Sequence, residues 1–210
     1  MKRILSSVAV FLILIGFTIT AGASTIAITG LNSWTPVSFS YNNVSYNNEY
    51  AGAFVLTIDG NTATGYCVDL FDTTYVPSGP YTNVNFANVN SSTTWGTWSL
   101  EAAWLMQNYG QSGNATQNAA VQMAIWELEY SGLNYTGSNT SLGSLISAYY
   151  TDAINANLTG YTGAGYEIAL LAPKAQNLLV DPAPVPEPTT LLLLGSGLLG
   201  LTGFRKKVIK

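Results

Sequence analysis

The 210-residue sequence contains no histidine and only one cysteine. Without histidine the chain cannot use Ser-His-Asp or Cys-His catalysis, and it lacks the usual ligand of zinc sites. One cysteine cannot form a disulfide within its own chain, so Cys67 is free, bonded to another molecule, or bonded to an atom other than sulfur. Any covalent chemistry must therefore use this thiol, carboxylates, amides, tyrosines or Lys174.

Charged residues are also scarce, and acidic residues outnumber basic ones. Charged residues make up 9% of the sequence, and six of the seven basic residues stand near the two ends. Residues 24–184 contain ten acids and one base, Lys174, which gives this part a net charge of −9. That balance argues against a nucleic-acid partner, which needs a cationic patch, and disfavours an anionic lipid surface. The plentiful Asn, Thr, Ser, Gly and Tyr instead suit the surface of an extracellular module.

Residues 1–23 have the three regions of a secretory signal peptide. Lys2-Arg3 is the charged start, residues 8–17 are apolar, and Ala21-Gly22-Ala23 supplies small residues at the end. We therefore expect cleavage near Ala23-Ser24 and an exported mature chain. An uncleaved anchor helix is the alternative.

The first half of the mature chain has the signals of β-strands. Alternating or β-branched runs predict strands over residues 25–28, 37–41, 53–58 and 62–68. Asp59-Gly60-Asn61 predicts a tight hairpin between the last two of these. Cys67 would then be held on a strand. Residues 72–97 are rich in turn formers and predict a connecting loop with a short strand near 84–89.

The hydrophobic period then changes to that of helices. We predict helices from the Ser99 cap to Gly110, from the Asn114 cap to Tyr130, and over residues 141–155, followed by strands over 166–171 and 175–180. On the second helix Gln122 shares a face with Ile125 and Trp126. This order predicts an α+β fold over residues 24–180, a β-sheet or barrel-like domain with an inserted helical subdomain whose last strands return to the first.

The C-terminal 30 residues have a different organisation. Residues 181–188 contain four prolines and predict a stiff linker. Residues 189–204 carry no charge, and as a helix they would span about 24 Å, short of a bilayer core of about 30 Å. Residues 205–210 are basic, which would keep the C-terminus cytoplasmic and the domain outside. We expect a short transmembrane or sorting helix here.

This tail resembles a PEP-CTERM sorting signal. The residues that carry the resemblance are Pro186, Glu187 and Pro188, then the Leu/Gly-rich span, then the basic run that begins at Arg205. The resemblance implies a Gram-negative bacterium, recognition by an exosortase, cleavage near Pro-Glu-Pro, and delivery to the cell surface or the extracellular matrix. A permanent single-pass anchor is the alternative.

Three segments resemble the motifs of bacterial surface thioester domains. Tyr66-Cys67-Val68-Asp69 is similar to the cysteine motif of that family, and Gln122-Met123-Ala124-Ile125-Trp126 to its Thr-Gln-x-Ala helix motif, with Val121 in place of the threonine. The segment around Gln176 resembles the one that supplies the bonded glutamine. The resemblance implies a thioester between Cys67 and Gln176, with Gln122 as a buried support. The alternative assignment makes Gln122 the bonded residue.

A thioester would attach the protein covalently to an amine-bearing target in one turnover, without cofactor or metal, so we do not expect an enzyme. Its formation needs a dry junction, with Trp126 and Trp104 as candidate walls, and Asp69, Glu127 or Glu129 could assist in place of histidine. A second hypothesis is a non-covalent structural or glycan-associated protein of an exopolysaccharide or biofilm matrix, with a free Cys67. The third is a hydrolase that uses carboxylates such as Asp69, Asp72 and Glu127.

Overall fold

The structure is a computed structural model that describes residues 24–90, 95–110, 113–163, 165–171 and 175–181. The expected signal peptide, the linker beyond Asp181, the short helix at 189–204 and the basic tail all lie outside these residues. Asp181, which we placed at the start of the linker, is bound to the domain. Its carboxylate accepts a hydrogen bond from the Thr64 amide at 2.8 Å, and its own amide donates to the Thr64 carbonyl at 3.0 Å.

The described residues form seven strands and three helices, as an α+β fold requires. In chain order they are β1 (Ser24–Tyr41), β2 (Val44–Ile58), β3 (Asn61–Cys67), β4 (Ser78–Asn88), α3 (Trp98–Tyr109), α4 (Ala115–Glu129), β5 (Asn134–Tyr135), α5 (Thr140–Ile154), β6 (Glu167–Leu170) and β7 (Leu178–Val180). The predicted fold class is therefore confirmed. The helices lie between the early and the late strands in sequence, as expected.

Six of the strands close on themselves. The pairing runs β2-β3-β7-β6-β4-β1, and β1 also pairs with β2, so the sheet forms a closed, barrel-like ring with β5 added beside β1. The last two strands complete this ring between β3 and β4. Closure therefore brings the end of the chain next to Cys67, which pairs with Leu178 across β3 and β7.

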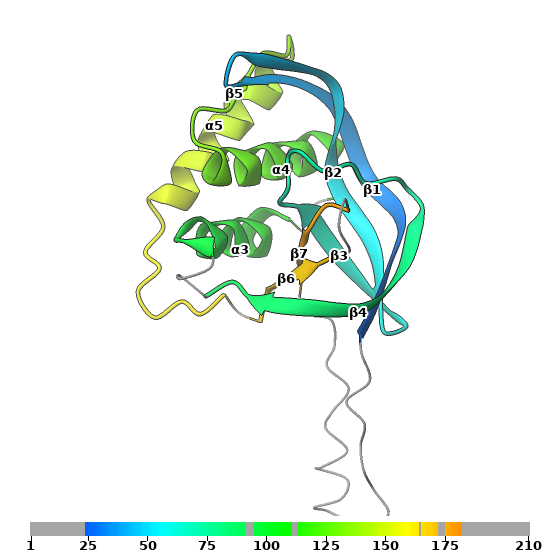
Figure 1. The fold of residues 1–210 in the computed structure, drawn as a ribbon. Helices are drawn as coiled ribbons and strands as arrows, with labels where there is room; N and C mark the ends of the chain where they lie inside the picture. The colour runs from blue at the N-terminus through cyan, green and yellow to red at the C-terminus, as the bar shows by residue number, and fades with distance from the viewer. Residues whose placement is uncertain (1–23, 91–94, 111–112, 164, 172–174, 182–210) are drawn as a thin grey trace, which may run out of the picture.

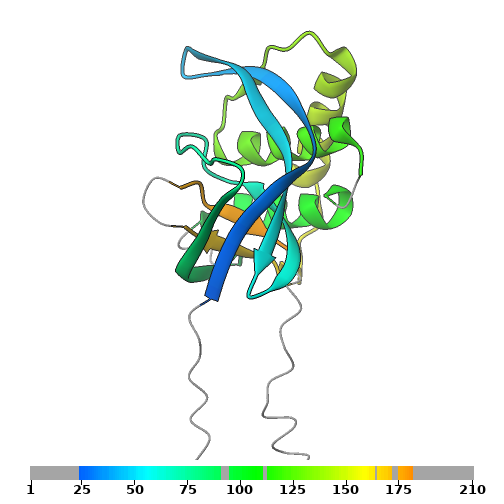
Figure 2. The same cartoon turned by 90° about the vertical axis from the view of Figure 1, so that its right-hand side faces the viewer.

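The long β1–β2 hairpin runs the length of the domain (Figure 1), and in the view of Figure 2 it lies in front of the helices. Its turn is made by Asn42 and Asn43, both at positive φ, which a two-residue turn of the right twist requires. The predicted Asp59-Gly60 hairpin between β2 and β3 is present, with φ of 49° and 85° at the two residues.

The segment before α3 differs from the sequence prediction. Residues 72–97 were expected to be a loop with a short strand, but β4 extends from Ser78 to Asn88 and includes Pro80. Proline cannot donate to a ladder. It is accommodated because the register with β1 shifts between the Ile26–Tyr81 and Ile28–Ser78 pairs, where the ladder is already interrupted.

Helix α4 is the centre of the domain. It contacts β1, β2 and β3 on one side and α3 and α5 on the other, and every residue from Asn118 to Trp126 is buried. Asn114 caps it as predicted, because its side-chain oxygen accepts from the amides of Thr116 and Gln117 at 2.9 and 3.2 Å. The buried run fixes which side chains of α4 reach β3.

The prediction for the start of α3 was wrong. Thr97 holds the N-cap position, whereas Ser99 lies inside the helix and is fully buried. The Ser99 hydroxyl donates to the carbonyl of Val89 at 2.7 Å, so it fastens the helix to the preceding segment instead of capping it. A serine at a helix start has both options, and the sequence alone does not distinguish them.

None of the helices in the described part of the chain has the length and hydrophobicity needed to cross a lipid bilayer.

Replacing Asn114 with Ala should lower the free energy of unfolding by about 1 kcal/mol, because two amides of the first turn of α4 lose their acceptor. Asn114→Asp, which keeps the accepting oxygen, is the matched control and should stay close to the wild type. Denaturant unfolding measures both. Equal stability of the Ala and Asp variants would contradict the capping role.

Candidate functional site

The Gln122 side chain binds both backbone groups of Cys67. Its Oε1 accepts from the Cys67 amide at 2.9 Å, and its Nε2 donates to the Cys67 carbonyl at 2.7 Å. Both residues are buried, with 1% and 2% of their surface exposed. A carboxamide can donate and accept in this way, so it takes the place of a neighbouring strand at the end of β3, where pairing with β2 stops at Gly65. Position 67 is therefore fixed by helix α4.

A second contact from α4 holds Tyr66. Its hydroxyl lies 3.1 Å from Asn118 Oδ1 and 3.1 Å from the Gly110 carbonyl, in the buried layer between α4 and the sheet. Asn118 and Gln122 are four residues apart and hence on one face of the helix. Successive turns of α4 thus hold successive residues of the Tyr66-Cys67 motif. Asn118 was not predicted, although its spacing from Gln122 was visible in the sequence.

The backbone carbonyl of Asp69 brings the sulfur of Cys67 and the side chain of Gln176 together. The Cys67 thiol donates to this oxygen at 3.3 Å, and Gln176 Nε2 donates to the same oxygen at 2.9 Å. The thiol and the carboxamide therefore cannot lie farther apart than these two bonds allow. Sequence reasoning could not find this acceptor, because it is a main-chain atom.

Asn177 positions the neighbouring Gln176 because its backbone and side chain bind the segments that follow β3 and β6. The Asn177 amide donates to the Asp69 carboxylate at 2.7 Å, its carbonyl accepts from Val68 at 3.0 Å, and its side-chain oxygen accepts from Leu171 at 3.1 Å. We predicted a strand over residues 175–180, but β7 begins only at Leu178. Two of these bonds involve side chains and one joins two backbone groups, and together they hold residues 175–177 without regular ladder pairing. Gln176 therefore lies in the loop before the strand.

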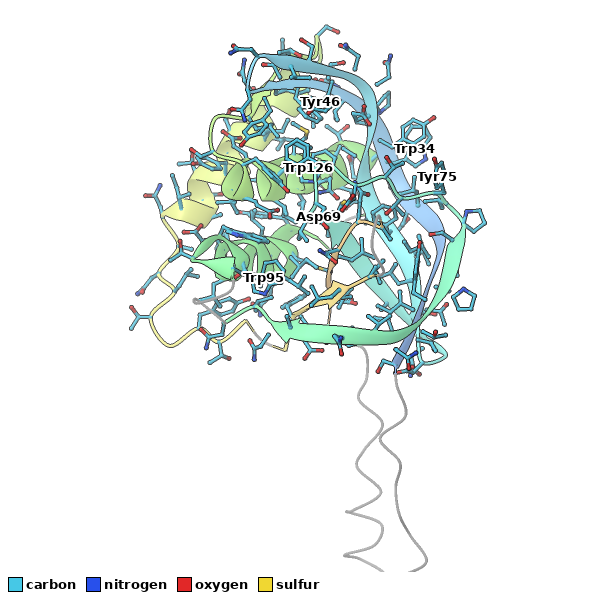
Figure 3. All side chains as sticks on the ribbon, in the orientation of Figure 1. Trp34, Tyr46, Asp69, Tyr75, Trp95 and Trp126 are labelled. Atoms are coloured by element: carbon cyan, nitrogen blue, oxygen red, sulfur yellow. The ribbon has the colours of Figure 1, made fainter. Side chains whose placement is uncertain are left out.

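Cys67 and Gln176 line the floor of a pocket of about 580 Å³. Its other walls include Trp126 and the exposed aromatic side chains Tyr50, Phe71 and Tyr75, with 62%, 62% and 76% of their surfaces exposed. Glu49 and Asp72 add carboxylates to the lining. Figure 3 shows Asp69 and Trp126 between the helices and strands and Tyr75 nearer the outer edge. Cys67 and Gln176 therefore belong to the lining of one pocket, although Cys67 is almost fully buried.

The thiol itself is held neutral. Burial is the main cause that raises the pKa of Cys67 well above its usual value, and the carboxylates of Asp69 and Glu129 add to it. The backbone at Asp69 and the indole of Trp126 act in the opposite direction but do not outweigh burial. Formation of a thiolate here therefore needs a group that accepts the proton.

Two polar atoms of α4 beside this thiol have no hydrogen-bond partner. Trp126 Nε1 and Glu129 Oε2 are both buried and unpaired, and their residues lie three apart on one helix face. Burial, and then the charge of Asp69, raise the pKa of Glu129 to about 8. Of the three acids considered from sequence, Asp69 and Glu129 influence Cys67, whereas burial alone raises the pKa of Glu127.

The structure brings Cys67, Gln122 and Gln176 together, although they come from a strand, a helix and a loop far apart in sequence. Trp126 lines the pocket, and Trp104 does not belong to its lining. The sorting residues Pro186, Glu187, Pro188 and Arg205 lie outside the described residues. In the described part of the chain no group of three or more Cys, Asp or Glu residues is placed to hold a metal ion.

The C-terminal segment is a match to a known sorting signal. Residues 184–207 match the family model of the PEP-CTERM protein-sorting motif. The motif implies an exported protein that is associated with the cell surface and is processed by an exosortase. The expectation drawn from Pro186-Glu187-Pro188 and the basic end is confirmed to that extent.

The described domain is similar to a thioester domain. A search of solved structures found the thioester domain of the Staphylococcus aureus TIE protein at 14% sequence identity, with 79% of this chain and 81% of that chain covered and a TM-score of 0.39. A search of curated proteins found no match.

Gln122→Ala should lower the free energy of unfolding by about 2 to 5 kcal/mol, because it leaves the buried amide and carbonyl of Cys67 unpaired. Gln107→Ala, at an exposed position of α3, is the matched control and should change stability by less than about 0.5 kcal/mol. Chemical denaturation measures the difference. A Gln122 variant as stable as the Gln107 variant would contradict the proposed clamp.

The raised pKa of Glu129 predicts that the stability of the folded protein depends on pH. This pKa is higher in the folded than in the unfolded state, so the folded state loses stability as the pH rises through the range from about 4.5 to 8. Glu129→Gln, which cannot ionise, should remove part of that loss and be more stable than the wild type above pH 8. Thermal melting across this range measures it. A wild type and variant with parallel pH profiles would show that Glu129 has an ordinary pKa.

Proposed function

We propose that Cys67 and Gln176 form an internal thioester with which this surface protein attaches itself covalently to an amine-bearing target. The observation that carries the proposal is the shared acceptor: the thiol of Cys67 and the Nε2 of Gln176 both donate to the Asp69 carbonyl. The thiol proton and this NH₂ group are the atoms that must depart together as ammonia when the sulfur bonds to the side-chain carbonyl carbon. The Asp69 carbonyl oxygen therefore holds both the thiol proton and the NH₂ group near the position where the thioester would form.

The roles of the two glutamines follow from their contacts. Both polar atoms of Gln122 are engaged by the backbone of Cys67, so bonding Gln122 to the sulfur would break that clamp. The Gln176 side chain, by contrast, does not bind the backbone of Cys67; its Nε2 donates to the Asp69 carbonyl. This favours Gln176 as the acyl donor and Gln122 as the support. The reaction balances as thiol plus carboxamide giving thioester plus ammonia.

Attack by a primary amine on the thioester carbonyl would then form an amide with Gln176 and return Cys67 to its thiol. The chain does not regenerate the thioester from that product, so the protein reacts once and is not an enzyme. The acidic domain would attract a target whose amine is protonated in solution and gives up that proton before it attacks. The described residues contain ten acids and no lysine or arginine, and two of the acids line the pocket that leads to Cys67.

A surface protein with this chemistry would serve adhesion or the cross-linking of an exopolysaccharide or biofilm matrix. We place it in a Gram-negative bacterium, with its apolar segment 189–204 in the membrane and its last residues in the cytoplasm until an exosortase removes them. The sorting motif supports this assignment.

The second candidate is a non-covalent glycan-associated role with a free Cys67. One observation favours it: Tyr50, Phe71 and Tyr75 are highly exposed and line one pocket, and Trp34 packs against Tyr50 with ring centroids 4.3 Å apart. Clustered exposed aromatics mark binding surfaces. Such a role requires no covalent bond at the pocket floor.

Intact mass distinguishes the two. The mature domain should be lighter than its sequence by one ammonia, about 17 Da. Incubation with methylamine should add the full mass of the amine to this lighter form, so the product exceeds the sequence mass by the difference between methylamine and ammonia. Cys67→Ala and Gln176→Ala should each abolish the deficit. Gln107→Ala should keep it in full. A wild-type domain of full mass would contradict the thioester and leave the non-covalent role.

A further inference from the structure

The two unpaired atoms of α4 need an explanation. Nearly all buried polar groups in folded proteins have partners, so each exception has a structural or chemical cause. Four side-chain atoms in the described residues are buried and unpaired: Trp95 Nε1, Trp126 Nε1, Glu129 Oε2 and the Tyr161 hydroxyl. Two of the four stand beside Cys67 on the helix face that also presents Gln122.

The Trp126 N–H completes no hydrogen bond of good geometry, but it lies near enough to the Cys67 sulfur to favour the thiolate by hydrogen bonding. The residue is 95% buried, since 5% of its surface is exposed, and it lines the same pocket as Cys67 and Gln176. Its indole is the side chain that favours the thiolate form of Cys67. No lysine or arginine among the described residues can do so. The ring packs against Phe39 at a tilt of 46°, with centroids 5.7 Å apart.

Glu129 is a carboxyl group close enough to Cys67 for its charge to act on the thiol. The groups that face it are Asp69, which disfavours its ionisation, and Cys67 and Tyr130, whose own ionisation it disfavours. Tyr130 is engaged as an acceptor by the Leu70 amide at 3.3 Å. Glu129 therefore keeps its proton to a pH near neutrality, where a carboxyl can both give and take a proton.

We propose that Trp126 and Glu129 form a proton-transfer pair that acts on the Cys67 sulfur, a proposal that builds on the thioester assigned to Cys67 and Gln176. When an amine attacks the thioester carbonyl, the carbon–sulfur bond breaks and the electron pair leaves with sulfur. The Trp126 N–H donates a hydrogen bond to this thiolate. The Glu129 carboxyl gives it a proton and takes one back from the nitrogen that has attacked, so the net products are the amide and the Cys67 thiol.

The pair also explains why the chain needs no histidine. An imidazole would ordinarily carry the proton between nitrogen and sulfur. Here a buried carboxyl with a pKa near 8 does so, and the indole supplies the donor that a cation would supply elsewhere. Trp126 Nε1 and Glu129 Oε2 lack partners while Cys67 is a thiol, which is unfavourable, but both are then in place when the thiolate forms.

The test is the rate of the methylamine reaction, followed by intact mass over a range of pH. Trp126→Phe keeps the ring and removes the N–H, and Glu129→Gln keeps the shape and removes the proton. Each should slow the reaction by about tenfold or more, and Glu129→Gln should also remove the inflection near pH 8. Trp95→Phe removes another unpaired N–H, beside α3 (Figure 3), and Glu101→Gln another half-buried carboxyl; both should react as the wild type does.

Wild-type rates and pH profiles in Trp126→Phe and Glu129→Gln would overturn the pair while leaving the thioester intact. A second measurement decides the matter if the wild type carries no thioester or a variant fails to form one. In a Gln176→Ala background, alkylation of Cys67 by iodoacetamide reports the pKa of the thiol. Glu129→Gln should lower that pKa and Trp126→Phe should raise it. An unchanged alkylation profile in both would overturn the pair whatever the state of the thioester.

Discussion

The arrangement of this domain depends on two hydrogen bonds between Gln122 and the backbone of Cys67. They join the middle of the most buried helix to the end of a strand, at 2.9 and 2.7 Å. Because the cysteine is held through its main chain, its side chain is left to face Asp69 and the pocket. A residue held this way keeps its place when its side chain reacts, which is what a site for covalent chemistry requires.

The closed sheet supplies the other half of the site. β7 pairs with β3 at Cys67, so the loop before β7 must pass the thiol, and Asn177 fixes that loop to Asp69 on one side and Leu171 on the other. Gln176 thus reaches the oxygen that accepts from the Cys67 thiol, although it is far from Cys67 in sequence and belongs to no regular element. Local unfolding of β7 would separate the two groups, so the proposed bond depends on the pairing of the last strand.

Much of the fold could be predicted from sequence because local signals and tertiary structure agree. The Asn114 cap and the Asp59-Gly60 turn each satisfy their own backbone and also fit the fold. Prediction failed where a distant partner decides the outcome. Pro80 lies in a strand because of a register shift with β1, and Ser99 is buried because Val89 offers an acceptor.

The site likewise has features that local sequence signals predict and features that only distant contacts determine. Cys67, Gln122 and Gln176 could be proposed from motifs, since residue type carries that information. The Asp69 carbonyl, which receives both the thiol and the Gln176 amide, could not be found, because every residue has such an oxygen and only the fold selects this one. Whether Trp126 Nε1 and Glu129 Oε2 have hydrogen-bond partners likewise depends on how deeply they are buried. The helical period suggests that these residues face the interior, but it does not give the degree of burial.

The proposed thioester is a covalent bond between two side chains, so a high-resolution crystal structure of the exported domain would reveal it. We expect continuous electron density from Cys67 Sγ to Gln176 Cδ, no Nε2 atom on Gln176, and Gln122 still bound to the Cys67 backbone. Separate side chains, with an intact Gln176 carboxamide donating to the Asp69 carbonyl, would contradict it.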